Sequence, residues 1–129
     1  MSKPAETGRL PSQRQLRVGE VIRRALSEIL MRGEIHNPDL AGASITVSEV
    51  RTSPDLRQAT AYVMPLGGAN AAEIVAALNA SSGQVRREIN RAVTLKFSPQ
   101  IEFRLDESFD RMDATRAMLS RPEVSRDLD

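Results

Sequence analysis

Three arginines, Arg86, Arg87 and Arg91, follow a short break in the helical pattern of the chain at Ser81-Ser82-Gly83. A helix that starts at such a break presents unpaired backbone N–H groups and the positive end of its dipole. This end attracts anions, and arginines on the following turns extend the attraction along a chain of phosphates. The stretch therefore predicts a binding site for a nucleic-acid backbone.

Arg87 and Arg91 lie one turn apart on the predicted helix, with Arg86 and Asn90 beside them. Like charges at this spacing destabilise an isolated helix by about 0.2–0.5 kcal/mol. Glu88 can relieve Arg91, whereas none of the helical neighbours of Arg87 is acidic. Bound phosphates would neutralise the repulsion. The alternative interpretation is a solvated basic face without a ligand.

The break also bears on the kind of nucleic acid. The known clamp for single strands has two glycines in a Gly-x-x-Gly loop between helices. Here only Gly83 is present, and Ala80 occupies the position of the first glycine. With one tyrosine and three phenylalanines, the chain has no obvious platform for stacking bases. Recognition of the shape and phosphates of folded RNA fits better than capture of a single strand.

Other kinds of chemistry are poorly supported. Without cysteine there are no disulfides or thiolate metal sites, and the only histidine, His36, lies in a turn-rich loop, so we expect no metal and no cofactor. The acidic residues at 106–113 have no neighbouring base or nucleophile, so we do not expect an enzyme. The N-terminus lacks a signal-peptide core, and no apolar run reaches the length of a membrane span, which predicts a cytoplasmic protein that binds no membrane. The net charge of +1 hides two basic blocks, 1–32 and 70–105, and an acidic end, 106–129.

Hydrophobic periodicity predicts the elements that position the basic stretch. A first helix is expected from about Ser12 to Arg32, opened by a capping box of Ser12 and Gln15. Alternating residues predict strands at 44–52 and 57–64, in which Ala59 and Ala61 suggest a face against which a helix packs closely.

After the two strands, Asn70 with Glu73 resembles a helix cap. The helix beyond Gly83 should turn four apolar residues inward, which are Val85, Ile89, Ala92 and Val93. A third strand follows at 101–105, and Ser108 caps a last, weaker helix.

The predicted order is helix, strand, strand, helix, kink, helix, strand. It implies an α+β domain with a mixed three-stranded sheet and helices on one face. We expect this domain to span residues 12–107, between a flexible arm at 1–11 and a C-terminal helix with an acidic tail at 108–129.

Between Arg14 and Ser108 the chain resembles the bacterial ribosome-binding factor A family in the order and spacing of many short matches. They include Glu34-Ile35 before Asn37-Pro38-Asp39-Leu40, Ile45-Thr46-Val47-Ser48-Glu49-Val50, Asp55-Leu56, Tyr62-Val63, Ser82-Gly83 with Arg86, and Pro99-Gln100-Ile101-Glu102-Phe103. This resemblance implies a type II KH-like fold. The family's helix break is usually Ala-x-Gly, and Ser81 stands here at the alanine position.

The resemblance further implies a non-enzymatic assembly factor that acts as a monomer. Proteins of this family bind the free, immature small (30S) ribosomal subunit near its neck and decoding region. They assist late folding of the 16S rRNA and processing of its 5′ end, then leave, commonly through a maturation GTPase. They matter most in the cold, because misfolded RNA helices rearrange slowly at low temperature.

The expected RNA-binding residues come from the break, the helix after it, the following loop and the start of the first helix. They are Ser81, Ser82, Gly83, Arg86, Arg87, Asn90, Arg91, Lys96, Arg14 and Arg17. The alternative function is a KH-like protein-interaction module that acts without direct RNA contact.

Overall fold

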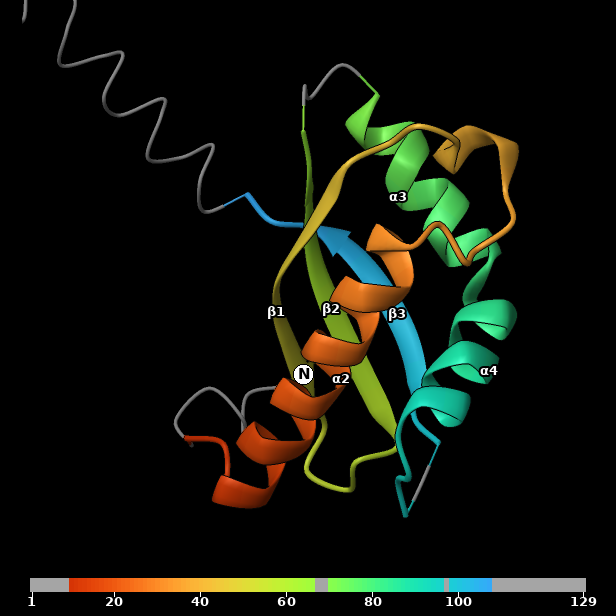
Figure 1. The fold of residues 1–129 in the computed structure, drawn as a ribbon. Coiled ribbons are helices and arrows are strands. Elements are labelled where there is room, and N and C mark those ends of the chain that lie inside the picture. Colours follow the sequence, from red (N-terminus) through yellow and green to blue (C-terminus); the bar gives the residue numbers. More distant parts are fainter. Residues whose placement is uncertain (1–9, 67–69, 97, 108–129) are drawn as a thin grey trace, which may run out of the picture.

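The structure is a computed structural model that describes residues 10–66, 70–96 and 98–107. Its elements run in the predicted order (Figure 1). They are α2 (Gln13–Met31), the 3-10 turn η1 (Pro38–Leu40), β1 (Ile45–Thr52), β2 (Gln58–Pro65), α3 (Ala71–Ala80), α4 (Ser82–Ala92) and β3 (Gln100–Leu105). The predicted α+β class is confirmed. The expected arm and the helix after Ser108 lie largely outside the described residues.

Helix α2 begins with the predicted capping box. The Ser12 hydroxyl accepts from the Gln15 N–H at 3.1 Å, and the Gln15 carboxamide accepts from the Ser12 N–H at 2.9 Å. These two bonds satisfy N–H groups that a helix start leaves unpaired. Gly33 follows the helix with a φ of 68°, a conformation that favours glycine and ends the helix.

The sheet has the order β1-β2-β3, with β1 antiparallel and β3 parallel to β2. Ala59 and Ala61 of β2 are buried, as expected for small residues beneath a helical layer. Strand β1 departs from strict alternation, because its register against β2 shifts between Val47 and Glu49. The Ser48 hydroxyl at this bulge donates to the Tyr62 carbonyl at 3.1 Å. The extra residue reverses the side-chain alternation of β1 at its midpoint.

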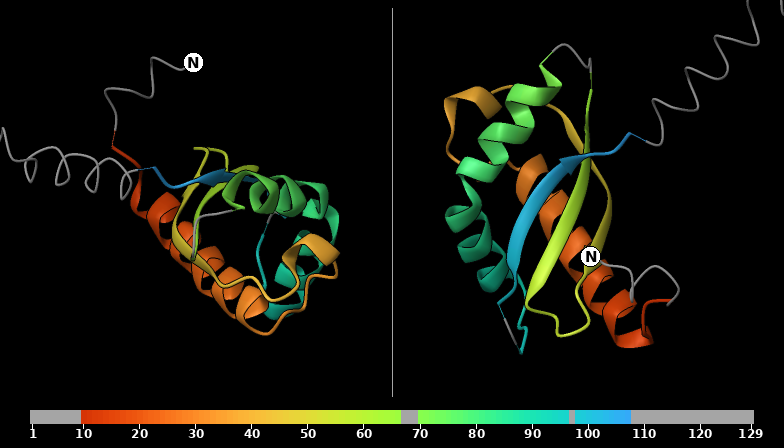
Figure 2. Two further views of the ribbon diagram at one scale, coloured as in Figure 1. Left: turned by 90° about the horizontal axis from the view of Figure 1, so that it is seen from above. Right: turned by 180° about the vertical axis from the view of Figure 1, so that it is seen from behind.

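Helices cover one face of the sheet, and the opposite face carries no helix in the described part of the chain (Figure 2). The core between the layers is apolar, with Phe103, Ile22, Leu26, Leu78 and Val63 each at most 1% exposed. Burial of a side chain of this size stabilises a fold by about 1.5–3 kcal/mol. Gly19 allows α2 to approach β1, because a Cβ there would lie 2.6 Å from the Val50 carbonyl oxygen.

Two local expectations were wrong. Asn70 precedes α3, but its side chain makes no capping hydrogen bond. Ala92 is exposed, because α4 ends there and the chain turns toward β3, although Val85 and Ile89 are buried as predicted. Val93 is half-buried.

Helix α3 is also tied to the edge strand of the sheet. The Asn79 carboxamide accepts from the Phe103 N–H at 2.8 Å and donates to the Phe103 carbonyl at 3.0 Å. One side chain thus satisfies two backbone groups that an edge strand would otherwise leave open. None of the described helices has the length and apolar character needed to cross a membrane.

Candidate nucleic-acid interface

The break between α3 and α4 is a single residue. The Ser81 N–H donates to the Ala77 carbonyl at 3.0 Å and completes α3, and α4 begins at Ser82. The first N–H bond of α4 runs from Val85 to the Ser81 carbonyl at 3.0 Å, and the Ser81 side chain caps none of the N–H groups before it. The start of α4 is therefore a helix end whose N–H groups can meet an anion.

The Ser81 side chain is instead bound to the loop that contains η1. Its hydroxyl accepts from the Asn37 carboxamide at 3.2 Å, and the same carboxamide reaches the Ala77 carbonyl at 3.4 Å. Gln84 fixes the next turn, because its carboxamide accepts from the His36 N–H and donates to the Glu34 carbonyl, both at 3.0 Å. The kink is therefore held rigidly from one side.

Gly83 lies on the open side of the kink. It is exposed, and a Cβ added there would meet nothing within 4 Å. Its φ lies outside the positive range that favours glycine, so neither the fold nor the local backbone requires glycine at this position. A helix position filled by glycine costs about 0.5–1 kcal/mol relative to alanine. The absence of a side chain at Gly83 would let another molecule approach the backbone closely, which could offset this cost.

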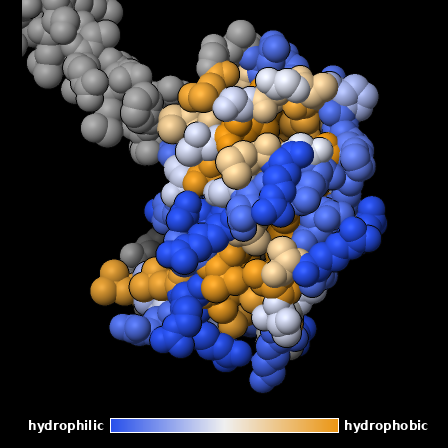
Figure 3. Space-filling view, viewed as in Figure 1, coloured by the Kyte–Doolittle hydropathy of each residue, from blue (hydrophilic) through white to orange (hydrophobic). Residues whose placement is uncertain are grey.

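Arg87 and Arg91 extend from α4 into solvent, on the side of the molecule where Figure 3 shows strongly hydrophilic residues. Arg91 forms the predicted ion pair with Glu88, at 3.6 Å, but its side chain remains 79% exposed. The Arg87 side chain has no hydrogen bond or ion pair within the described ranges. Both guanidinium groups are thus accessible to phosphates.

Arg86 and Asn90 lie beside them but bind within the protein. Arg86 Nη2 donates to the Ser98 carbonyl at 2.8 Å and reaches its hydroxyl at 3.3 Å. The Asn90 carboxamide donates to the same hydroxyl at 2.9 Å. These contacts fix the loop between α4 and β3, which also carries the exposed Lys96.

The first turn of α2 is not brought together with α4. Arg14 and Arg17 are exposed, and Figures 1 and 2 place the start of α2 on the other side of the molecule from α4. The turn is held to the end of β1, because the Gln15 carboxamide donates to the Thr52 carbonyl at 3.0 Å. If these arginines contact RNA, they do so at a second place.

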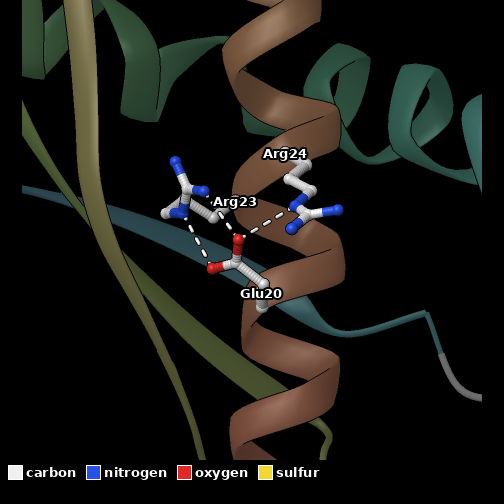
Figure 4. A network of polar contacts seen from close by, with 3 residues as sticks. All are labelled: Glu20, Arg23 and Arg24. Atoms are coloured by element: carbon white, nitrogen blue, oxygen red, sulfur yellow. Dashed lines mark hydrogen bonds and ion pairs between the residues drawn. The ribbon is translucent and has the colours of Figure 1, made fainter.

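Further along α2, two arginines share one acid (Figure 4). Glu20 accepts from Arg23 at 2.6 and 2.9 Å and from Arg24 at 3.0 Å. These hydrogen bonds, from Arg23 first and Arg24 second, lower the pKa of Glu20 from 4.5 to about 2. The cluster keeps a net charge of +1, but both guanidinium groups in the middle of α2 are engaged by a carboxylate, unlike that of Arg87 in α4.

Sequence reasoning did not identify Ser98, Gln84 or Asn37 as residues that shape this site. Each acts through a contact to a distant segment, and only the folded chain shows such a contact. No cluster of three potential metal-ligand side chains occurs among the residues that the structure describes.

The mixed sheet, the helices on one face and the kinked helix pair define an α+β protein of type II KH-like fold, as the resemblance implied. Residues 14–119 match the model of the family described as ribosome-binding factor A, so the chain belongs to this family. The match runs past Ser108, where the sequence resemblance was expected to end.

Individual relatives agree with this assignment. Ribosome-binding factor A of Paracoccus denitrificans is 58% identical over 123 residues, which cover 95% of this chain and 89% of the relative. The crystal structure of ribosome-binding factor A from Thermus thermophilus is similar with a TM-score of 0.57 at 25% identity, covering 70% of this chain and 94% of that one. A Thermus thermophilus homology model fitted into a cryo-EM map of a 30S complex has a TM-score of 0.53 at 24% identity, covering 67% and 89%.

Proposed function

We propose that this protein binds the free small ribosomal subunit and assists late maturation of its 16S rRNA without catalysing a reaction. The observation that carries the proposal is the pair of exposed arginines, Arg87 and Arg91, beside the uncapped start of α4. The similar Thermus thermophilus protein has been fitted into the map of a 30S complex, which supports the same partner here.

In this proposal the RNA backbone runs along the exposed side of α4. Phosphates accept from N–H groups at the start of the helix near Gly83 and from the two guanidinium groups. Ser82 belongs to this start. The contacts that Ser81 and Asn90 make within the protein hold the surface in shape, and Arg86 is fixed beside them through its bond to Ser98. Among the described residues, Tyr62 on the sheet is the one aromatic side chain outside the core, and no row of aromatic rings is present. Contacts to phosphates and to the shape of the RNA are therefore favoured over base stacking.

The proposal extends to the cellular role. The protein acts as a cytoplasmic monomer during 5′-end processing of the 16S precursor, is released with the help of a maturation GTPase, and matters most in the cold. Family membership supports these steps, which lie beyond the geometry of the site. We also propose that residues 12–107 are the subunit-binding domain and that the segments on either side are accessory.

Sedimentation through a sucrose gradient tests the partner. The protein should travel with free small subunits, and not with assembled ribosomes or with an RNA-free protein mixture. Equal recovery with assembled ribosomes would argue against an assembly factor.

The site is tested with Arg87→Glu combined with Arg91→Glu. The double variant should stay folded, with a slightly lower thermal stability because Glu88 loses its ion pair with Arg91, and should lose co-sedimentation with small subunits. Because charge reversal is a large change, Arg87→Gln with Arg91→Gln should give a smaller loss in the same direction. The matched control is Arg51→Gln with Arg104→Gln, which removes two exposed arginines from the sheet face without a helix. Undiminished binding of the folded Arg87→Glu, Arg91→Glu protein would refute the site.

The second candidate function is a protein-interaction module, and salt distinguishes the two. RNA binding releases counterions, so the logarithm of the affinity should fall steeply and linearly with the logarithm of salt concentration. A nearly flat dependence would favour a protein partner on the subunit.

A further inference from the structure

A shallow depression of about 430 Å³ lies where β2 and β3 begin, beside α4. Figure 1 shows these two strand starts side by side at the foot of the molecule. The lining residues are Arg57, Gln58, Arg86, Ser98 and Gln100. They supply two guanidinium groups, two carboxamides and a hydroxyl, and no carboxylate. A lining of this composition suits an anion with several acceptor oxygens.

The guanidinium group of Arg86 is fixed in this lining and keeps its charge uncompensated. Its Nη2 is held by Ser98 at 2.8 Å, which fixes the direction of the side chain. Its Nε is buried and has no acceptor among the described residues, and no carboxylate there lies within ion-pair distance of it. A fixed cation without a counter-charge favours an anionic ligand nearby.

Arg57 is placed by a turn that is itself rigid. Leu56 precedes it with a φ of 63°, which side chains rarely adopt, and is held there by burial of its side chain at 6% exposure. The Arg57 N–H donates to Asp55 Oδ1 at 3.1 Å, and the Arg57 carbonyl accepts from the Gln100 N–H at 2.9 Å. The Asp55 carboxylate also accepts from the Ser53 hydroxyl at 2.7 Å. That bond first, and then the Arg57 N–H and the Arg57 charge, lower the pKa of Asp55, so Asp55 interacts with Arg57 although it lies outside the lining.

The two glutamines are held in register with each other. Gln58 and Gln100 are direct partners in the parallel β2–β3 ladder, at the first position of each strand. Their exposed side chains lie at the mouth of the same depression. Three segments far apart in the sequence therefore converge on it: the β1–β2 turn, α4 and the start of β3.

We propose that this depression binds one phosphate group of the RNA backbone, between the guanidinium groups of Arg57 and Arg86 and within reach of the Gln58 and Gln100 carboxamides. The inference rests on the proposed function and adds the β1–β2 turn to the contact surface. The same guanidinium and carboxamide groups could bind a phosphate of an RNA strand that runs along α4 or the phosphate of a free small molecule. The geometry favours the strand, because Arg86 belongs to the same helix as the exposed Arg87 and Arg91.

The test measures binding of the full chain to free small subunits at several salt concentrations. Arg57→Gln should weaken binding about tenfold, the effect of losing one charge-assisted contact, and should lower the salt slope by about 0.7. Arg104→Gln, four residues along β3 from Gln100 and not part of the lining, is the matched control and should stay within about twofold of the unchanged protein. Thermal unfolding verifies that both variants fold.

A second arm uses inorganic phosphate as the probe. In a nitrogen-detected NMR titration at constant ionic strength, phosphate should shift the Arg86 Nε–H and the Gln58 and Gln100 carboxamide signals only weakly, in the millimolar range. A short phosphate-rich RNA hairpin should shift the same signals at concentrations at least about tenfold lower. Saturation by micromolar phosphate would overturn the RNA assignment in favour of a small-anion pocket.

The failure of this inference is distinguishable from that of the proposed function. Arg57→Gln could bind subunits with unchanged affinity while Arg87→Gln with Arg91→Gln binds them more weakly. In that case the depression does not bind phosphate, and the proposed function stands. If the unchanged protein itself fails to bind small subunits, the proposed function and this inference both fall.

Discussion

Gly83 offers a substitution that should strengthen the fold and weaken binding. It is the second residue of α4, and a Cβ there would meet nothing within 4 Å. Gly83→Ala should therefore raise the free energy of unfolding by about 0.5 kcal/mol, since alanine loses less backbone entropy in a helix. For a domain of this size, that gain corresponds to a rise in melting temperature of roughly 2–4 °C.

The same methyl group should interfere with RNA. A phosphate oxygen that accepts from an N–H at the helix start lies within about 3 Å of the nitrogen, so the added Cβ obstructs its approach. We expect the affinity for small subunits to fall about three- to tenfold. Urea unfolding gives the stability, and binding of labelled protein to purified subunits gives the affinity.

Gly19→Ala is the matched control, because its Cβ would lie 2.6 Å from the Val50 carbonyl oxygen. That clash should destabilise the fold by about 1–3 kcal/mol through overpacking. If Gly83→Ala were less stable than the unchanged protein, the space around Gly83 could not be open as the structure shows. An unchanged affinity of the stabilised variant would refute contact between RNA and the start of α4.

Three further predictions follow from other contacts. Arg14→Gln with Arg17→Gln should reduce subunit affinity less than the same change in the two exposed arginines of α4, because the start of α2 lies apart; an equal or larger loss in the binding assay would move the main contact to α2. The pKa of Glu20 is lowered from 4.5 to about 2, so its stabilising effect is complete above about pH 4.5 and is lost as the pH falls through 2. Urea unfolding of Glu20→Gln should therefore show a deficit that shrinks across this range, and a deficit independent of pH would contradict the linkage. Asn79→Ala should lower the free energy of unfolding by about 1–3 kcal/mol, since it leaves the Phe103 N–H unpaired, and wild-type stability in urea would show that water replaces the bond.

Local patterns were sufficient to predict the order of the elements. The capping box at Ser12 and the alternation in β2 and β3 depend on residues within a few positions of each other, and the structure confirms them. The bulge at Ser48 and the end of α4 before Val93 depend on how distant segments meet. No short-range pattern records them.

In the candidate site, too, the features that depend on local spacing could be predicted and those that depend on distant contacts could not. Exposure of Arg87 follows from helical spacing, which the sequence contains. The internal bonds of Arg86 and Asn90 do not, because their partner Ser98 lies beyond the end of the helix. The depression at Arg57 was not predicted, since its lining comes from three separate segments.

The position of α4 in the connection between β2 and β3 has a consequence for folding. A parallel strand pair can form only after its crossover is complete, and contacts between distant residues form slowly. The helix pair between Pro65 and Gln100 is thus fixed on the sheet only when β3 has paired. We therefore expect the nascent chain to expose the arginines of α4 before β3 pairs and fixes the helix pair on the sheet. We expect a chain that stops before Gln100 to bind RNA weakly and without preference for the small subunit. Specific binding should begin only when the last strand is complete.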